Sequence, residues 1–188
     1  MATRQPGSVN VLVAHEAIAA AGAAGRRTLP RETGGILLGF RTPDLVVVTR
    51  AVVVDDPASS GRTYLRHRRR AQALLTAVRQ DACSVVGYVG EWHTHPADQP
   101  PSPTDLRALA ETARMAPSVV VLLVIGYSEQ GPTRLHSRVA RCKHVMPVAA
   151  IDLVDIEHCT LTITEDTAAS LEQEAATLLH LSLPENDP

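Results

Sequence analysis

The sequence predicts an α/β fold in which helices pack against a mixed β-sheet. Segments with helical and strand-like patterns alternate along the chain, and two neighbouring strand-like segments are separated by only a few residues with turn chemistry. The alternation places helices against the sheet, and the short connection favours an antiparallel hairpin within it. A chain of 188 residues, 45% of them hydrophobic, is long enough for one substantial core and does not require a second. We therefore predict a single domain.

The first third of the chain contains three predicted strands and one helix. A short apolar strand spans residues 8–13, and an Ala-rich helix follows over residues 14–24, where Gly25 is expected to close it. The next two strands are rich in β-branched residues and cover residues 36–40 and 45–54. Because a Thr-Pro-Asp turn separates them, they are expected to pair as a hairpin.

The middle of the chain alternates helices with strands. Apolar residues at helical spacing predict one helix around residues 71–78 and a second around residues 106–113. Between them lies a predicted strand over residues 84–92, which a Pro-rich stretch follows. The almost wholly apolar segment 118–125 predicts a strand covered on both faces, and residues 133–140 are expected to return beside it.

The C-terminal part is expected to extend the same domain. We assign residues 1–142 to the main domain and residues 143–188 to an extension that packs on it. Within the extension, residues 145–156 could add a strand. A terminal helix is predicted by apolar residues that share one face, namely Leu171, Ala175, Leu178 and Leu179. This helix either closes the core or forms a dimer contact, and we favour closing the core.

The composition argues against several classes of function. The formal net charge is −2 at pH 7, which favours neither nucleic acid nor an anionic membrane as a partner. Aromatic residues make up only 3% of the chain, too few for the stacking platforms of single-strand nucleic-acid binders. We see no signal peptide and no apolar stretch of the ~20 residues that cross a membrane. Three cysteines without a CxxC pair fit a reducing compartment, so a cytoplasmic protein is expected.

The candidate chemistry lies in the segment GEWHTHP and the SPTD that follows it. Side chains on a strand alternate between its faces, so His93 and His95 point the same way. Pro96 ends the strand, and the chain can then bring Asp105, at the start of the next helix, back to the same place. Two imidazoles and one carboxylate are a ligand set for Zn²⁺ that leaves a fourth position open for water, as catalytic zinc sites require.

Each part of this pattern also has a purely structural explanation. The His-x-His pair alone fits two polar residues at the edge of a strand. The SPTD segment, with Ser102 as N-cap, fits a helix start. Glu32, in the segment ETGGILLG, fits a solvated charge at a turn, with glycines for backbone freedom. The combination favours a site, in which the glycines would let a neighbouring strand or a substrate backbone approach closely.

Glu91 is a second candidate for the catalytic base, because it shares the strand parity of His93 and His95. A residue two positions before His93 lies ~6–7 Å along the strand from it. That separation suits a group that orients an imidazole better than a group that acts on a metal-activated water.

Taken together, ETGGILLG, HTHP and SPTD resemble the JAMM motif of the JAB/MPN metalloprotease family, over roughly residues 9–139. The resemblance implies a single MPN (JAB) domain with a cytidine-deaminase-like fold. Family members with an intact motif are zinc peptidases that cut isopeptide or peptide bonds after the C-terminus of ubiquitin-like proteins. By position, the resemblance implies the zinc ligands His93, His95 and Asp105, the general acid/base Glu32 and the oxyanion-stabilising Ser102.

The sequence departs from the family pattern at one point. Nine residues separate His95 from Asp105, one fewer than is usual in the family, so the Pro-rich loop between them is tighter. The tighter loop bears more on the role of Ser102 than on the ligands. The motif wording is closer to bacterial JAB proteases, which are often encoded beside activating-enzyme-like and conjugating-enzyme-like proteins in antiphage operons. Such proteins are the partners that the resemblance implies.

The resemblance thus implies a deconjugating zinc isopeptidase whose protein substrate carries an extended C-terminal tail. Two alternatives share the same site: a processing peptidase for a ubiquitin-like or sulfur-carrier precursor, and a non-catalytic zinc-binding MPN scaffold. Family members typically bind the tail by strand addition, and residues 52–64 are the expected edge for it. The basic residues that follow fit either a solvated helix start or a dock for an acidic patch: Arg66, Arg68, Arg69 and Arg70.

Overall fold

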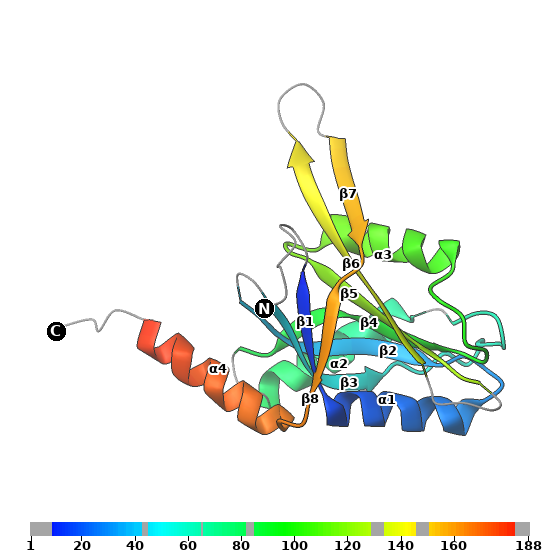
Figure 1. Ribbon diagram of the computed structural model, residues 1–188, viewed down its shortest axis with the longest axis horizontal. Helices are drawn as coiled ribbons and strands as arrows, with labels where there is room; N and C mark the ends of the chain where they lie inside the picture. Colours follow the sequence, from blue (N-terminus) through cyan, green and yellow to red (C-terminus); the bar gives the residue numbers. More distant parts are fainter. Residues whose placement is uncertain are drawn as a thin grey trace, which may run out of the picture.

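The computed structural model describes residues 9–42, 45–64, 66–81, 85–128, 134–145 and 151–182. Within these ranges, four helices flank one eight-stranded mixed sheet with the order β7-β6-β5-β4-β2-β3-β1-β8 (Figure 1). The strands are β1 (Asn10–Ala14), β2 (Gly34–Arg41), β3 (Leu45–Val53), β4 (Gly87–His95), β5 (Val120–Gly126), β6 (Arg134–Val145), β7 (Ile151–Glu157) and β8 (Thr160–Thr164). The helices are α1 (His15–Thr28), α2 (Arg68–Asp81), α3 (Pro103–Met115) and α4 (Ala168–Ser182). The predicted α/β fold with a mixed sheet is confirmed.

Helices cover both faces of the sheet, with α1 and α3 on opposite sides (Figure 1). Helix α1 buries a row of alanines, and its small side chains let it lie close against a core that includes Trp92 of β4. On the other face, Leu109 and Ala113 of α3 pack against Leu122 and Val124 of β5. Strand β5 is buried along its whole length, as predicted for a strand covered on both sides.

Strand β4, which carries the two histidines, lies in the middle of the sheet. It pairs antiparallel with β2 on one side and parallel with β5 on the other. The predicted hairpin of β2 and β3 is confirmed by their antiparallel pairing, although Pro43 and Asp44 of its turn lie outside the described residues. Because both neighbours of β4 are themselves paired, the backbone positions of the histidines are fixed from both sides.

The predicted end of the first helix was wrong. Helix α1 continues through Gly25 to Thr28 instead of ending at Gly25. The glycine serves packing: a Cβ added at Gly25 would meet the Tyr127 ring and lie 2.7 Å from Thr94 Cγ2. The Tyr127 hydroxyl also donates to the carbonyl of Gly22, 2.8 Å away, so the missing side chains make room for a ring that anchors α1 to the sheet.

Two further differences concern the strands. Strand β4 begins at Gly87, later than the predicted residue 84, and it ends at His95, just before Pro96 as the HTHP segment predicted, so both histidines are in its regular alternation. Strand β8 was not predicted, because its TLTIT sequence is short and polar. It is a strand because it pairs parallel with β1 over five positions. The backbone of β1 supplies the hydrogen-bond partners, and the sequence of β8 alone does not predict this pairing.

The C-terminal extension adds to the same sheet. Strand β6 continues past residue 142, β7 pairs with it, and α4 follows β8. The strand expected within residues 145–156 is present as β7, while residues 146–150 lie outside the described ranges. The division of the chain at residue 142 stays a prediction.

Helix α4 closes the core only at its beginning. Leu171 packs with Ala14 and Val47, and the Arg50 guanidinium holds the buried Glu172 with Nε to Oε1 at 3.0 Å. Further along, Leu178 and Leu179 are 57% and 45% exposed, and the helix projects away from the sheet (Figure 1). Core closure, as predicted, therefore holds for the first turns alone. None of the helices in the described ranges combines the length and apolar character that a bilayer-spanning segment needs.

The two adjacent glycines at the start of β2 allow a close approach of strands, as the sequence suggested. A Cβ added at Gly34 would lie 2.8 Å from the Cβ of His93, and one added at Gly35 would collide with the carbonyl oxygen of Val52. These contacts involve backbone or the stem of a site residue, so the neighbours cannot swing aside. Gly34 therefore lets β2 lie directly beside the histidine strand, and Gly35 lets it lie close to β3.

We expect Gly35→Ala to lower the free energy of unfolding by about 1–3 kcal/mol or more, because the new methyl group must displace backbone in the middle of the sheet. The matched control is Gly87→Ala on β4, where an added Cβ has no atom within 4 Å. Chemical denaturation of both variants measures the difference. Equal stability of the two variants would contradict a role of Gly35 in close strand packing.

Candidate metal centre

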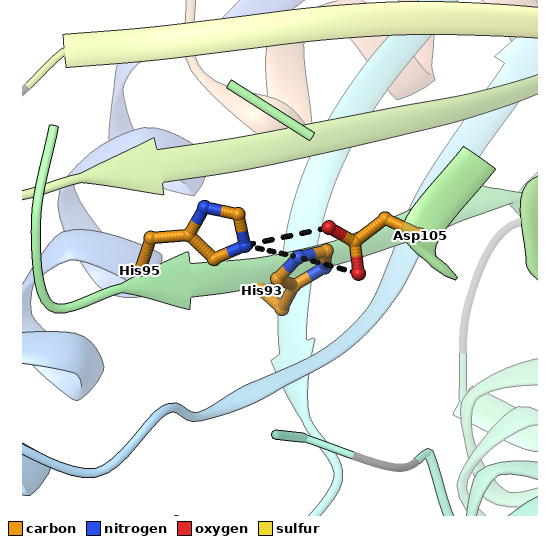
Figure 2. Close-up of side chains that lie close together, drawn as sticks. All are labelled: His93, His95 and Asp105. Atoms are coloured by element: carbon orange, nitrogen blue, oxygen red, sulfur yellow. Dashed lines mark hydrogen bonds and ion pairs between the residues drawn. The ribbon is translucent and has the colours of Figure 1, made fainter. Parts of the chain in front are cut away.

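Two histidines of β4 form the core of the site. His93 and His95 lie on the same face of the strand, as the period of two predicts, and both are buried. Their Nε2 atoms are 3.1 Å apart (Figure 2). Two basic nitrogens held this close and out of solvent are unfavourable unless a proton or a cation lies between them.

Asp105 completes the cluster from the first turn of α3. Its two carboxylate oxygens lie 3.4 Å from His93 Nε2 and 3.4 Å from His95 Nε2 (Figure 2). A capping box holds the residue in place: the Ser102 hydroxyl accepts from the Asp105 N–H, and the Asp105 carboxylate accepts from the Ser102 N–H at 2.6 Å. The structural explanation of SPTD as a helix start is thus correct, and it coexists with the cluster.

The three side chains fit a tetrahedral metal ion. The separations of 3.1–3.4 Å between their ligand atoms match the edge of about 3.3 Å expected around Zn²⁺ with bonds of about 2.0 Å. The His95 Nδ1 lies 3.1 Å from the carbonyl oxygen of Gln99. If Nδ1–H donates there, the lone pair of the neutral ring is left on Nε2, facing the cluster. In the described residues this is the one group of three or more His, Cys, Asp or Glu side chains arranged to hold a metal.

The charges within the cluster are strongly coupled. Burial alone would raise the pKa of Asp105, but hydrogen bonds from His93 and His95 outweigh it and hold the pKa far below its usual range. The hydrogen bond to Asp105 raises the pKa of His95 against the opposite effect of burial. Asp105 thus favours a proton on His95, and a metal at this site would compete with that proton.

Glu32 is buried beside this cluster, at the end of the segment that leads into β2. Burial raises the pKa of Glu32, and the nearby His95 and His93 partly offset that effect. The backbone N–H of Glu32 donates to the Ser60 carbonyl at 2.7 Å. A solvated charge at a turn, the structural alternative for this residue, is therefore wrong, because Glu32 is only 7% exposed. A buried carboxylate with a raised pKa next to this group of candidate metal ligands is suited to proton transfer.

Glu91 has other partners than the sequence suggested. Its carboxylate forms an ion pair with Arg66, whose Nε lies 2.8 Å away, and accepts from the Tyr88 hydroxyl at 2.9 Å and from the Thr112 hydroxyl at 3.4 Å. These are the contacts of Glu91 within the described residues, and its role of orienting an imidazole stays a prediction. A register shift in β4 opposite Leu37 and Leu38 brings Tyr88 and Glu91 within reach of each other.

A cleft of about 570 Å³ opens beside the cluster, between α3 and the segment that precedes α2. His93 and Asp105 line one end, and Tyr64, Arg66 and Met115 are among the other lining residues. Its walls are mainly apolar, which suits part of a polypeptide chain. The predicted docking edge at residues 52–64 borders the cleft only through Tyr64.

The four arginines of the basic run separate into different environments. Arg66 is largely buried against Glu91, whereas Arg68, Arg69 and Arg70 begin α2 and are exposed. Arg70 Nη1 lies 3.9 Å from an Asp55 carboxylate oxygen, and the Arg68 guanidinium contacts the sulfur of Met115. The solvated helix start describes Arg69 and Arg70, whereas Arg66 and Arg68 both line the cleft.

Sequence reasoning missed the groups that support the ligands. The Gln99 carbonyl is backbone and carries no residue-type signal. Thr94, between the two histidines, exchanges hydrogen bonds with Thr33: its hydroxyl accepts from the Thr33 N–H at 3.0 Å, and its own N–H donates to the Thr33 carbonyl at 2.8 Å. The only sequence signal for this contact was that both Thr33 and Thr94 are polar and adjoin site residues. Their hydrogen bonds hold the segment that carries Glu32 beside the histidine strand.

Comparison with known proteins agrees with this arrangement. A family model described as prokaryotic homologs of the JAB domain matches residues 14–142. The chain is 30% identical over 97 residues to a CD-NTase/cGAS isopeptidase of Escherichia coli, covering 50% of this chain and 62% of that protein. It is 38% identical over 86 residues to a protein of the same name from Enterobacter hormaechei, covering 44% of this chain and 46% of that protein. The chain thus spans less than two thirds of the length of these relatives.

A solution structure of a protein from Desulfitobacterium hafniense has the same fold. It matches with a TM-score of 0.61 and 21% identity, covering 84% of this chain and 94% of that one. At this level of identity the similarity concerns the fold alone. It supports a single MPN-like domain that includes most of the described chain.

Proposed function

Because this chain belongs to the family of prokaryotic JAB-domain proteins, we propose that it is a zinc-dependent isopeptidase that removes a conjugated protein from its target. The observation that carries the proposal is the tetrahedral spacing of the ligand atoms of His93, His95 and Asp105. Glu32, buried beside the cluster, supplies the acid/base group that hydrolysis requires.

The proposed substrate is taken from the names of the two relatives. Both are called CD-NTase/cGAS isopeptidases, so we propose an isopeptide-linked conjugate of a CD-NTase as the substrate, within a bacterial antiphage system. The partners would then include the activating-enzyme-like and conjugating-enzyme-like proteins that form the conjugate. The cleft that opens from His93 and Asp105 offers room for chain on one side of the scissile bond.

In the proposed hydrolysis each residue of the site has a separate role. His93, His95 and Asp105 would hold Zn²⁺, which when bound polarises a carbonyl and makes water available as hydroxide near neutral pH. The Glu32 carboxylate takes a proton from the attacking water and passes it to the departing lysine amine. The Ser102 hydroxyl accepts from the Asp105 N–H, so its own proton stays available to a developing oxyanion.

We expect the purified protein to cleave an isopeptide-linked CD-NTase conjugate, and a chelator to abolish the cleavage. Alkylation of cysteines should leave the activity intact, because no Cys–His pair contributes to the proposed site. The measurement is gel analysis of the conjugate with and without chelator, zinc and alkylating reagent. A linear fusion of the same modifier, tested in parallel, separates an isopeptidase from a processing peptidase. Cleavage of the linear fusion alone would favour the processing peptidase, and no cleavage of either substrate by the zinc-loaded protein would favour the non-catalytic scaffold.

A further inference from the structure

The loop that follows β4 crosses over β5 and is fastened to β6. Asp98, in this loop, uses both carboxylate oxygens: Oδ1 accepts from His136 Nε2 at 3.1 Å, and Oδ2 forms an ion pair with Arg134, whose Nε lies 3.1 Å away. Asp98 and His136 are 26% and 23% exposed, so their contact is partly shielded from water, whereas Arg134 is 71% exposed and its ion pair lies at the surface. The contact with His136 is therefore the better shielded half of the bridge, and the Arg134 ion pair contributes less.

The bridge lies in register with the metal ligands. His95 is paired with Gly126 of β5, which is paired in turn with Arg134. Two residues away on each of these strands, His93 is paired with Val124, which is paired with His136. The two β6 side chains that hold Asp98 therefore lie on the same cross-strand rows as the two histidines.

Gly126 makes the crossing possible. A Cβ added at Gly126 would lie 3.0 Å from the Cα of Asp98 and 3.2 Å from the carbonyl oxygen of Ala97. The loop therefore lies flat on β5 at the one position where the strand has no side chain to lift it. Only nine residues separate His95 from Asp105, and the three prolines Pro100, Pro101 and Pro103 restrict this connection further.

Next to Asp98, the same loop delivers the carbonyl that contacts His95. The Gln99 N–H donates to the Ala97 carbonyl at 2.8 Å, which makes a tight turn centred on Asp98. The turn places the Gln99 carbonyl oxygen 3.1 Å from His95 Nδ1. Anything that fixes Asp98 therefore fixes this oxygen as well.

We propose that Asp98 is a positioning residue of the metal centre: its bridge to Arg134 and His136 holds the Gln99 carbonyl against His95 and keeps that ring in the Nδ1-protonated tautomer. In this form Nε2 is free to face the metal together with His93 and Asp105. The part of this inference that concerns the metal rests on the proposed function, while the part that concerns the tautomer does not.

The test uses the full chain and two independent readouts. Long-range ¹H–¹⁵N NMR of the imidazoles in the metal-free protein, at alkaline pH where the rings are neutral, reports the His95 tautomer. Competition with a chromophoric chelator gives the zinc dissociation constant. We expect a larger fraction of the Nδ1–H form in the wild type than in Asp98→Ala, because the Asp105 carboxylate competes for the proton from the Nε2 side in both proteins, and a zinc dissociation constant raised by about 10–100-fold in that variant.

Three further variants make the result specific. Asp98→Asn keeps one acceptor for β6 and should restore part of the wild-type behaviour. Gly126→Ala should reproduce the smaller Nδ1–H fraction by lifting the loop, without touching any charge. Asp55→Ala, which removes an exposed partner of Arg70, should behave as the wild type in both readouts. If Asp98→Ala does not fold, Asp98→Asn and Gly126→Ala decide.

A wild-type fraction of the His95 Nδ1–H form in Asp98→Ala and Gly126→Ala would overturn this inference. A wild-type protein that binds no zinc would instead contradict the proposed function, and the tautomer comparison would still decide the role of Asp98. The two failures are therefore distinguishable.

Discussion

Glu32→Gln is expected to keep zinc and the fold but to lower turnover by about 10²–10⁴-fold, the usual contribution of a general acid/base. Glutamine is close in size and shape to glutamate and keeps one acceptor oxygen. Its amide, however, cannot take up the proton of the attacking water at neutral pH. Glu32 is buried beside the histidines and does not belong to the ligand cluster, so its replacement should leave the metal in place. The measurement is conjugate cleavage at saturating zinc, together with zinc content.

The comparison variant for this experiment is Glu91→Gln. The Glu91 carboxylate is held by Arg66, Tyr88 and Thr112, so its neutralisation should destabilise that part of the cleft wall. We expect a lower stability of the variant and measurable turnover. If Glu91→Gln is inactive at full zinc occupancy while Glu32→Gln still turns over, the assignment of the base is wrong.

Removal of a ligand is the second change with a large expected effect. Wild-type protein should carry about one zinc ion per chain, and His93→Ala or Asp105→Ala should lose most of it. The loss of affinity should exceed the roughly 10–100-fold typical of residues that only orient a ligand, because two protein ligands cannot close a tetrahedral site. Elemental analysis after gel filtration measures the zinc content.

Two controls accompany the ligand variants. Ser102→Ala removes the hydroxyl that caps α3 and should reduce stability by about 0.5–2 kcal/mol while zinc content is retained. His158→Ala removes an exposed histidine far outside the cluster and should change neither quantity. Zinc absent from wild-type protein even after supplementation, or unchanged in Asp105→Ala, would contradict the assigned ligands.

The ligand cluster could be predicted because local rules determine it. Strand alternation places His93 and His95 on one face, and the N-cap pattern of SPTD places Asp105 on the first turn of a helix. Each rule involves residues close in sequence, so it does not depend on how the rest of the chain folds. The closeness of Glu32 to this cluster came from the family resemblance, because no local rule joins residues so far apart in sequence.

The features that could not be predicted depend on contacts between distant segments. Gly25 carries the signal of a helix end, and only the Tyr127 ring packed on it explains why the helix continues. The polar sequence of β8 becomes a strand through its pairing with β1. Glu91 has the right parity to meet His93, and a register shift in its strand gives it different neighbours.

The double use of Asp105 has a consequence for how the protein handles metal. The carboxylate that would bind zinc is already fixed by the start of α3, and the imidazoles are fixed by a central strand. The candidate ligands are thus fixed by the packing of α3 and of a central strand, so little chain ordering is left for a metal to induce. Unlike a zinc finger, which unfolds without its ion, this domain should be emptied and refilled repeatedly in its native state. Its zinc content would then follow the free zinc of its surroundings, so that metal supply could set how much of the enzyme is active.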